Sequence, residues 1–458
     1  MSSLKKIKWD MLPIIIALAW PTVLEQFMQT AVQYIDTAMV GSLGTAATAA
    51  VGSTTTINWL VNGSISALGI GFLSFIAQSL GANEGEKAKR AAAQSVLVCL
   101  ICGVFFTVLT LSFSPIVPMI MQVEEEIRPA AAQYFFILYA PMIARAAILI
   151  FGTVLRAAGD TKTPMFIGAL VNVVNVVLNF FLIYSTRAVN LFGTEVVVYG
   201  AGLGINGAAL ASAISFVVGG IIITAALLRH KSISPLGYKM LPDKQILSPC
   251  LKVAMPNMLQ RFATYLGYVV FASMINSVGE TATAAHTIAG TVESAFYIPG
   301  YGMQSAAATL AGNALGARDK VMMREFSKVI LIVEILLMII SGALLYIFAE
   351  PMMAIFSDDA EVIALGTTVL RMVAVTEPFF GAAIILEGMM LGVGNTVVPF
   401  IYNVIGMWCV RIGGTFLCTV VFGGDLVSAW VCMIAHNIIL FALFLVRYLR
   451  RKWNPLEA

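Results

Sequence analysis

The sequence predicts an all-α polytopic membrane protein with about twelve transmembrane helices in two pseudo-symmetric six-helix lobes. Composition is the first reason: 59% of the 458 residues are hydrophobic and 11% are charged, and the mean hydropathy is +0.91. An average soluble domain carries about 25% charged residues. The second reason is that apolar runs of about 20 residues, the length that crosses a bilayer, recur along the chain. The third is an internal repeat.

The repeat relates the two halves of the chain. A shift of 235 residues brings residues of the first half onto identical residues of the second, without a gap. The matching pairs include Ala19 and Ala254, Pro21 and Pro256, Leu24 and Leu259, Gly159 and Gly394, and Pro164 and Pro399. A single offset over such a distance indicates a duplicated unit, which is common in secondary transporters. We expect a first lobe over 1–228, a connector over 229–246 and a second lobe over 247–458.

The apolar runs predict the positions of the spans. We place them approximately at 11–37, 47–79, 92–114, 130–155, 164–185, 203–228, 247–275, 282–313, 327–349, 362–391, 397–420 and 426–448. The first span has no cleavage site after it, so we interpret it as a retained helix rather than a signal peptide. The six cysteines show no paired or metal-ligand spacing and are interpreted as packing residues.

Charge alternates between successive linkers. Most of the lysines and arginines lie in the N-terminus (Lys5, Lys6, Lys8), the loop at 82–90, the 229–252 connector, the loop at 316–328 and the C-terminus. The opposite linkers contain Arg128 and Arg187 beside several acids. Since cytoplasmic loops carry the excess of positive charge, we expect both termini in the cytoplasm and the protein in the inner or plasma membrane.

The first span contains a polar stripe. On a helix, five polar side chains fall on one face: Thr22, Glu25, Gln29, Gln33 and Asp36. Such a stripe must face protein or water, because lipid does not tolerate it. The stripe could simply pack against a neighbouring helix. An unpaired carboxylate at membrane depth is costly, however, so Asp36 is a candidate ion or proton site.

Polar residues also share a face in the fifth and eighth spans. Asn172, Asn175 and Asn179 are spaced by three and four residues, which suits either helix packing or cation coordination. The eighth span places five polar residues on one face: Thr283, His286, Glu293, Tyr297 and Gln304. His286 and Glu293 lie two turns apart and could form a proton-sensitive pair. Gln29, Gln33, His286, Glu293 and Tyr297 are therefore candidate cavity residues.

The tenth span adds two acids, Glu377 and Glu387, as candidate cavity or secondary ion sites. Four arginines fall inside spans and are expected to pair with buried acids or to reach an interface: Arg145, Arg261, Arg371 and Arg411. The available acids are Glu25, Glu334, Glu377 and Glu387. No nucleotide-binding GxxxxGK[ST], HExxH or GxSxG motif occurs, which argues against an ATPase, a protease or a hydrolase.

Several motifs resemble those of the multidrug and toxic compound extrusion (MATE) family. They are the first-span stretch PTVLEQFMQTAVQYIDTAMVGSLG, SLGAN at 79–83, LRAAGDTKTPM at 155–165, NVVNVVLN at 172–179 and GINGAALASAIS at 204–215. The resemblance covers essentially the whole chain. It implies twelve helices in two lobes and export of organic cations or other amphipathic compounds, driven by a Na⁺ or H⁺ gradient.

The resemblance also implies coupling residues. DinF-like members use a first-helix Asp, matched by Asp36, a fifth-helix Asn, matched by Asn175, a second Asp, replaced here by Asn179, and a sixth-helix hydroxyl, matched by Ser212. NorM-like members use acids in the seventh and tenth helices, and the seventh-helix position is Thr264 here. The chain therefore resembles the DinF-like pattern more closely. If Na⁺ is the coupling ion, its ligands would be Asp36, Asn175 and Asn179.

These observations together predict a cation-coupled antiporter rather than an enzyme. It would exchange H⁺ or Na⁺ for small cationic or amphipathic compounds, need no cofactor, bind no nucleic acid and act as a monomer in the lipid bilayer. The alternative is a flippase for a lipid-linked precursor, which has a similar hydropathy profile. A flippase would be expected to present a more basic central cavity, whereas the spans hold more acids than arginines.

Overall fold

The computed structural model describes residues 9–52, 54–121, 123–191 and 194–457; Lys5, Lys6 and Lys8 lie outside this part. In the residues that the structure describes, the first half contains a 3₁₀ turn at Trp9–Met11, nine helices and a hairpin. The elements are α1 (Leu12–Gly41), α2 (Thr45–Gly52), α3 (Thr55–Gly81), α4 (Gly85–Phe113), α5 (Val117–Ile120), α6 (Arg128–Tyr139), α7 (Met142–Ala157), α8 (Lys162–Leu182), β1 (Ser185–Leu191), β2 (Thr194–Ala201) and α9 (Gly204–Arg229).

The second half is entirely helical in the described residues. Its elements are α10 (Lys244–Asn276), α11 (Glu280–Gly316), α12 (Lys320–Phe356), α13 (Ala360–Ala374), α14 (Glu377–Gly392), α15 (Val397–Val404), α16 (Gly413–Thr415) and α17 (Leu426–Leu449). Two π-helical stretches, Ile405–Ile412 and Phe416–Val421, flank α16. The predicted all-α polytopic architecture is confirmed.

The predicted spans correspond to three groups of helices: single long helices, bent pairs of helices, and the pair α10 and α11. Eight described helices are long and apolar enough to cross a membrane, and two bent pairs, α6 with α7 and α13 with α14, pass the same test. The remaining two predicted spans correspond to α10 and α11, which have 33 and 37 residues but are not among the helices that pass this test.

The two bends occur at equivalent places in the repeat. The pairs bend by 50° and 53°, beside Pro141 at the N-cap of α7 and Pro378 in the first turn of α14. These prolines lie 237 residues apart, within two residues of the sequence offset. Proline lacks a backbone N–H and its ring blocks the preceding turn, so a helix breaks there.

Sequence analysis missed two features. The β1–β2 hairpin is antiparallel and lies between the fifth and sixth spans, where we expected no strand. Valines and alternating polar residues in this short linker favour strands, but the surrounding apolar runs obscure that pattern. The π-helical turns between 405 and 421 were also missed, because such turns insert residues without changing composition.

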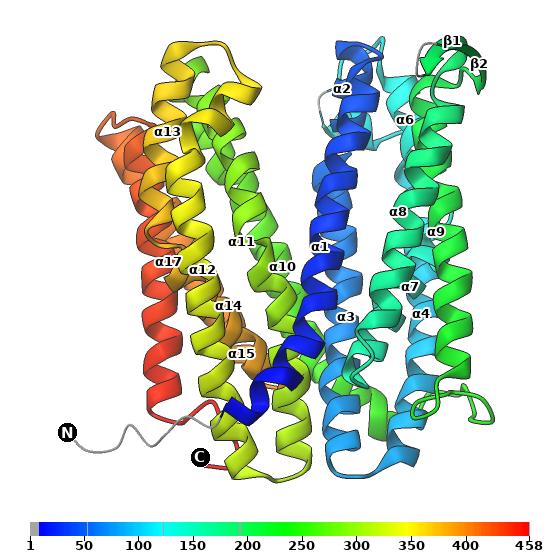
Figure 1. Cartoon of the computed structure of the whole chain (residues 1–458), viewed down its shortest axis with the longest axis vertical. Coiled ribbons are helices and arrows are strands. Elements are labelled where there is room, and N and C mark those ends of the chain that lie inside the picture. Colours follow the sequence, from blue (N-terminus) through cyan, green and yellow to red (C-terminus); the bar gives the residue numbers. More distant parts are fainter. Residues whose placement is uncertain (1–8, 53, 122, 192–193, 458) are drawn as a thin grey trace.

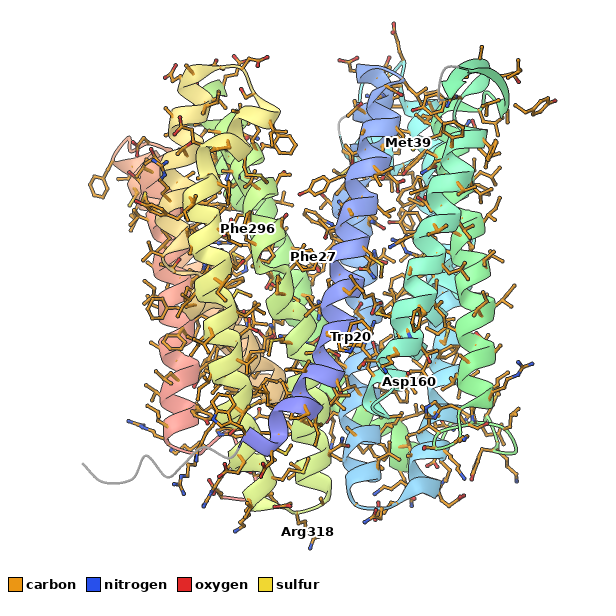
Figure 2. All side chains as sticks on the ribbon, in the orientation of Figure 1. Trp20, Phe27, Met39, Asp160, Phe296 and Arg318 are labelled. Atoms are coloured by element: carbon orange, nitrogen blue, oxygen red, sulfur yellow. The ribbon has the colours of Figure 1, made fainter. Side chains whose placement is uncertain are left out.

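The helices form two groups, with α1–α9 in a first lobe and α10–α17 in a second (Figure 1). The lobes diverge toward the β1–β2 hairpin and meet near the chain termini (Figure 1). In Figure 2, Met39 lies near the end of α1 at which the lobes diverge. Arg318, just after α11, lies at the opposite end of the molecule. The basic linkers therefore gather at the closed end, which we call the basic end.

At the basic end the two lobes are in close contact, through hydrogen bonds from side chains to backbone carbonyl groups and through a close approach at a glycine. Thr22 Oγ1 donates to the Gly302 carbonyl at 2.8 Å, and Ser74 Oγ and Gln78 Nε2 donate to the Gly392 carbonyl, each at 3.0 Å. A Cβ at Gly316 would stand 1.9 Å from the Gln78 carbonyl oxygen. Glycine at that position permits α3 and α11 to approach closely, as in other membrane helix pairs.

Candidate functional site

The predicted coupling residues meet between α1, α8 and α9. Asn179 Nδ2 donates to Asp36 Oδ1 at 2.6 Å and lies 3.2 Å from Asn175 Oδ1. Asn175 Nδ2 lies 2.9 Å from Ser212 Oγ. Asn175 is 5% exposed and Asn179 1%, so an acid, two amides and a hydroxyl form one chain of hydrogen bonds away from lipid. We call these four residues the Asp36 cluster.

The Asn175 amide can serve this cluster in either orientation. One end of the amide lies 2.8 Å from Asp36 Oδ1 and 3.2 Å from Oδ2, while the other end lies 2.9 Å from Ser212 Oγ. If the oxygen faces Asp36, a hydrogen bond requires a proton on the carboxyl group. If the nitrogen faces Asp36, the ionised carboxylate accepts and Ser212 donates to the Asn175 oxygen. The contact between Asn175 and Asp36 can therefore be a hydrogen bond in either protonation state of Asp36, but with the nitrogen facing Asp36 the two asparagines no longer bond to each other, because two amide nitrogens then lie 3.2 Å apart.

The other polar residues of the first span do not join the Asp36 cluster. Gln29 and Gln33 are exposed, on the divergent half of α1. Glu25 is buried and forms an ion pair with Arg156, at 2.7 Å and 2.8 Å from its two carboxylate oxygens. Arg156 lies one residue beyond the predicted span at 130–155, and sequence analysis sought the partner of Glu25 among the arginines inside the spans, which was wrong. The third asparagine, Asn172, leaves its Nδ2 buried and unpartnered among the described residues.

A second polar cluster in the first lobe was not predicted. Arg145, 7% exposed, donates to Asn58 Oδ1, and Tyr139 Oη donates to the same oxygen at 3.2 Å. The guanidinium carbon lies 4.8 Å from the Phe216 ring centroid and 5.5 Å from that of Tyr139. Arg145 thus contacts an amide and two rings instead of the expected acid, so its charge is held partly by cation–π attraction. Asn58 does not belong to a periodic row of polar residues, so sequence analysis did not single it out.

In the second lobe, aromatic rings surround Arg411. Its guanidinium carbon lies 5.1 Å from the Phe271 centroid and 5.5 Å from that of Tyr268. The ring of His286 meets Phe271 and Trp430 edge-on, at 5.6 Å and 5.9 Å between centroids. The described residues include no hydrogen bond or ion pair between His286 and Glu293. His286 therefore packs as an aromatic residue in this conformation.

A buried histidine that sequence analysis overlooked lies nearby. His436 is 6% exposed, and neither of its ring nitrogens has a partner among the described residues. A Cβ at Gly406 would stand 2.5 Å from its ring, so a glycine makes room for it beside the π-helical stretch. A lone histidine in an apolar helix carries no periodicity that would reveal this position.

Two acids of the second lobe are fully enclosed. Glu334 is 0% exposed and Glu377 is 1% exposed, and all four carboxylate oxygens lack a hydrogen-bond partner in the described structure. A Cβ at Gly300 or Gly381 would stand 2.9 Å or 2.8 Å from Glu334 Oε1. Glycines on α11 and α14 thus make space for this carboxyl group. An isolated carboxylate is costly to bury, which favours the neutral form of each acid here.

We predict that replacing Glu334 with leucine raises thermal stability by about 1–3 kcal/mol, because it removes an unpartnered buried polar group. The midpoint of unfolding in detergent, followed by tryptophan fluorescence, measures this. Glu334→Leu should also be compared with Glu325→Leu, an acid on the same helix nearer the basic end. A Glu334→Leu protein that is less stable than the parent would show that the carboxyl group makes a stabilising interaction.

The remaining acid of the tenth span, the remaining arginines and Tyr297 contact residues other than the predicted partners. Gln260 Nε2 donates to Glu387 Oε1 at 2.7 Å, and Arg261 Nε donates to Asn257 Oδ1 at 3.2 Å. The Tyr297 ring lies 5.6 Å from Phe380 and 5.9 Å from Tyr301. Arg371 approaches the exposed Glu350 at 3.7 Å. Hence, within the described part of the chain, none of the four intramembrane arginines forms an ion pair with the acids that we had proposed as partners.

A polytopic helical protein with two related lobes and buried polar clusters in each defines a class: membrane transporters. The MatE family model matches residues 21–181 and again residues 256–417, and the matches begin at the 235-residue offset of the internal repeat. Together they cover more than half of the chain. The chain belongs to the MatE family, a family of membrane transporters.

Relatives and solved structures agree with this assignment. The chain is 27% identical over 440 residues to the probable multidrug resistance protein NorM of Thermotoga maritima, covering 96% of this chain and 92% of the relative. It is 23% identical to the multidrug resistance protein MdtK of Proteus mirabilis, covering 88% and 86%. An outward-facing multidrug resistance MATE family transporter shares the fold with a TM-score of 0.89, 22% identity and full coverage of both chains. A Vibrio cholerae MATE transporter, VcmN, gives a TM-score of 0.87 at 19% identity, covering 98% of each chain.

Proposed function

We propose that this protein is a proton-coupled antiporter that exports organic cationic or amphipathic compounds by alternating access. The names of several relatives, which describe multidrug resistance proteins, support the export of small molecules. The Asp36 cluster supports ion coupling, and it is the single observation that carries the proposal. Substrate binds between lobe 1–228 and lobe 247–458, which the 229–246 connector joins, and both termini lie in the cytoplasm.

The chemistry of the Asp36 cluster favours a proton over Na⁺. Asn179 directs an N–H at Asp36 Oδ1, at 2.6 Å, and this donor competes with a metal ion for the oxygen. The cluster contains a single carboxylate, since the neighbouring position is an asparagine, and a hard cation prefers several oxygen ligands. The Asn175 amide, with its two workable orientations, instead accommodates a carboxyl group that gains and loses a proton.

Coupling follows if proton and substrate favour opposite conformations. When Asp36 gains a proton, it donates a hydrogen bond to Asn175 instead of accepting one from it. This change alters the contacts between α1 and α8. The exposed Gln29 and Gln33 lie on the same helix, so a substrate between the lobes contacts the element that carries Asp36. Because two ligands that bias one equilibrium in opposite directions must compete, proton entry drives substrate release.

Dye accumulation in cells tests the proposed substrate class. Cells that express the protein should accumulate less of several structurally unrelated cationic dyes than cells with an empty vector. An uncharged dye of similar size serves as the control for general leakiness. Unchanged accumulation of every dye would contradict export of organic cations, and a defect in the translocation of lipid-linked precursors would then point to the flippase alternative.

A further inference from the structure

The first turns of α10 form a short amphipathic segment at the basic end. Ile246, Cys250 and Ala254 are buried, and a Cβ at Gly71 of α3 would stand 2.3 Å from the Cys250 carbonyl oxygen. This row of residues, spaced by four, therefore packs closely against the first lobe. The other faces of the segment are not covered in this way.

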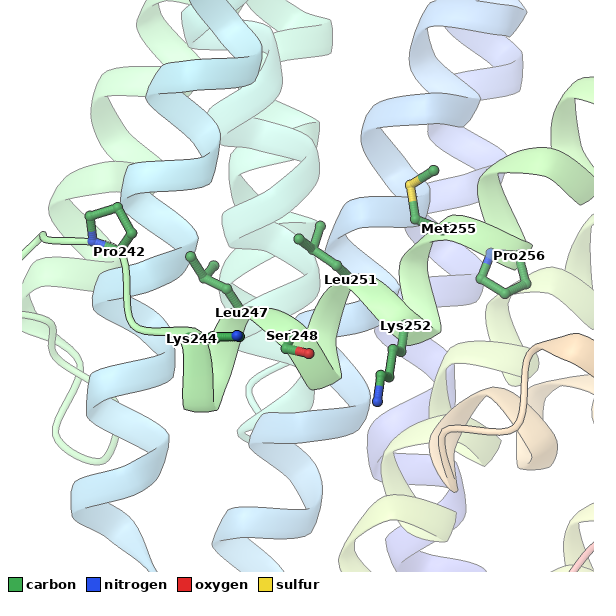
Figure 3. A pocket seen from close by; sticks show the side chains of 8 residues that line it. All are labelled: Pro242, Lys244, Leu247, Ser248, Leu251, Lys252, Met255 and Pro256. Atoms are coloured by element: carbon green, nitrogen blue, oxygen red, sulfur yellow. The ribbon is translucent and has the colours of Figure 1, made fainter.

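Next to the buried row lies an apolar row that is partly open: Leu247 is half-buried against the core, and the two residues that follow it in the row are exposed. Leu247, Leu251 and Met255 are also spaced by four residues, and Leu251 and Met255 are 40% and 44% exposed. They line a hollow of 620 Å³. Figure 3 shows all three side chains pointing to one side of α10. An open apolar row on a membrane protein is stable only if acyl chains or another apolar partner cover it.

A third row carries positive charge. Lys244, Ser248 and Lys252 line the same hollow, and the Lys252 side chain points away from the side on which Leu247, Leu251 and Met255 project (Figure 3). Both lysines are exposed and form no ion pair among the described residues. The nearest acid in sequence, Asp243, already pairs with Arg90. Hence two uncompensated cations stand beside an apolar surface.

The segment also has the orientation of an interfacial helix. Figure 3 shows it running across the neighbouring helices of the first lobe before α10 turns alongside them near Met255 and Pro256. Pro249 and Pro256 lie inside α10, and because proline bends a helix, this part can differ in direction from the rest. A helix with an apolar face and a lysine-bearing face lies at the boundary between acyl chains and head groups.

We propose that this hollow binds an anionic phospholipid. The phosphate lies beside Lys244, Ser248 and Lys252, and an acyl chain covers Leu247, Leu251 and Met255. Charge complementarity selects an anionic over a zwitterionic lipid, because lysines near a membrane surface attract negative head groups. Since the opposite face of the segment packs on α3, the lipid braces the contact between the lobes at the basic end.

Native mass spectrometry of the full chain in detergent tests this proposal. The probes are phosphatidylglycerol and phosphatidylcholine with identical acyl chains. We expect one phosphatidylglycerol to bind with an affinity on the order of tenfold higher than phosphatidylcholine. Lys244→Gln/Lys252→Gln should abolish this preference, whereas Lys239→Gln/Lys320→Gln, which removes the same charge from exposed lysines at the same end, should retain it.

Two further experiments distinguish a bound phospholipid from other occupants of the hollow. Leu251→Ser should weaken both lipids while leaving the ratio of their affinities unchanged, because it removes contact with the acyl chain only. Excess glycerol phosphate, a head group without chains, should not displace bound phosphatidylglycerol. Equal affinity for the two lipids in the parent protein, an unchanged preference in Lys244→Gln/Lys252→Gln, displacement by glycerol phosphate, or a dimer that excludes lipid would each overturn the proposal.

Discussion

Replacing Asp36 with asparagine is expected to reduce ion-driven efflux by on the order of 100-fold, within the range of coupling between two ligand sites. Asparagine has nearly the same shape as aspartate and can still accept the hydrogen bond from Asn179, which is 2.6 Å long in the parent. It cannot gain or lose a proton at physiological pH. The variant should therefore fold and bind substrate but fail to exchange it for protons. Dye efflux from vesicles measures the loss.

The matched control for this prediction is Asp358→Asn, which makes the same substitution at an exposed acid of the divergent end. It should leave efflux unchanged. Protein content in the membrane and the thermal midpoint must be equal for the two variants, so that a folding defect is excluded. Normal gradient-driven efflux by the Asp36→Asn variant would contradict the assignment of Asp36 as the coupling residue.

The second large effect concerns stability. Glu25→Gln should destabilise the protein by about 3–5 kcal/mol, because it leaves the partly buried Arg156 without its counter-ion. The side chains of Glu25 and Arg156 are only 9% and 19% exposed, so water compensates little. Arg156 also accepts a hydrogen bond from Thr309 of the second lobe through its carbonyl, at 3.2 Å. Loss of the pair should therefore loosen the contact between the lobes, and thermal unfolding in detergent measures the effect.

Two variants show whether the effect belongs to the pair. Glu25→Gln/Arg156→Gln should recover most of the lost stability, since no uncompensated charge remains. Glu84→Gln, which breaks the exposed pair between Glu84 and Lys87, should change stability by at most about 1 kcal/mol. If Glu25→Gln were fully stable but changed the ion dependence of efflux, Glu25 would belong to the ion pathway instead.

Periodicity and resemblance predicted much of this molecule. Helical spacing put Asn175 and Asn179 on one face, and resemblance linked them with Asp36 and Ser212, which the structure brings into hydrogen-bond contact. Their roles in coupling remain a proposal. The repeat offset predicted two related halves, and the family model matches the chain twice at that offset.

Partners across helices were harder to predict, because periodicity describes one helix at a time. Glu25 pairs with Arg156, which is near enough only because α1 and α7 approach each other. Arg145 finds Asn58 and two aromatic rings, none of which carries a charge that would reveal the contact. Glu334 is accommodated by glycines on two other helices, and such complementarity leaves no trace in a single sequence.

Vesicle efflux with one gradient at a time tests proton coupling most directly. Membrane vesicles containing the protein are loaded with a cationic dye, and a pH gradient or a Na⁺ gradient is imposed separately. We predict that the pH gradient alone drives dye movement, and that Asp36→Asn abolishes it while Asp358→Asn does not. Movement driven only by Na⁺ would contradict the account and would require another carboxylate, Glu293 first, to complete the site. No movement with either gradient would contradict multidrug export and favour the flippase.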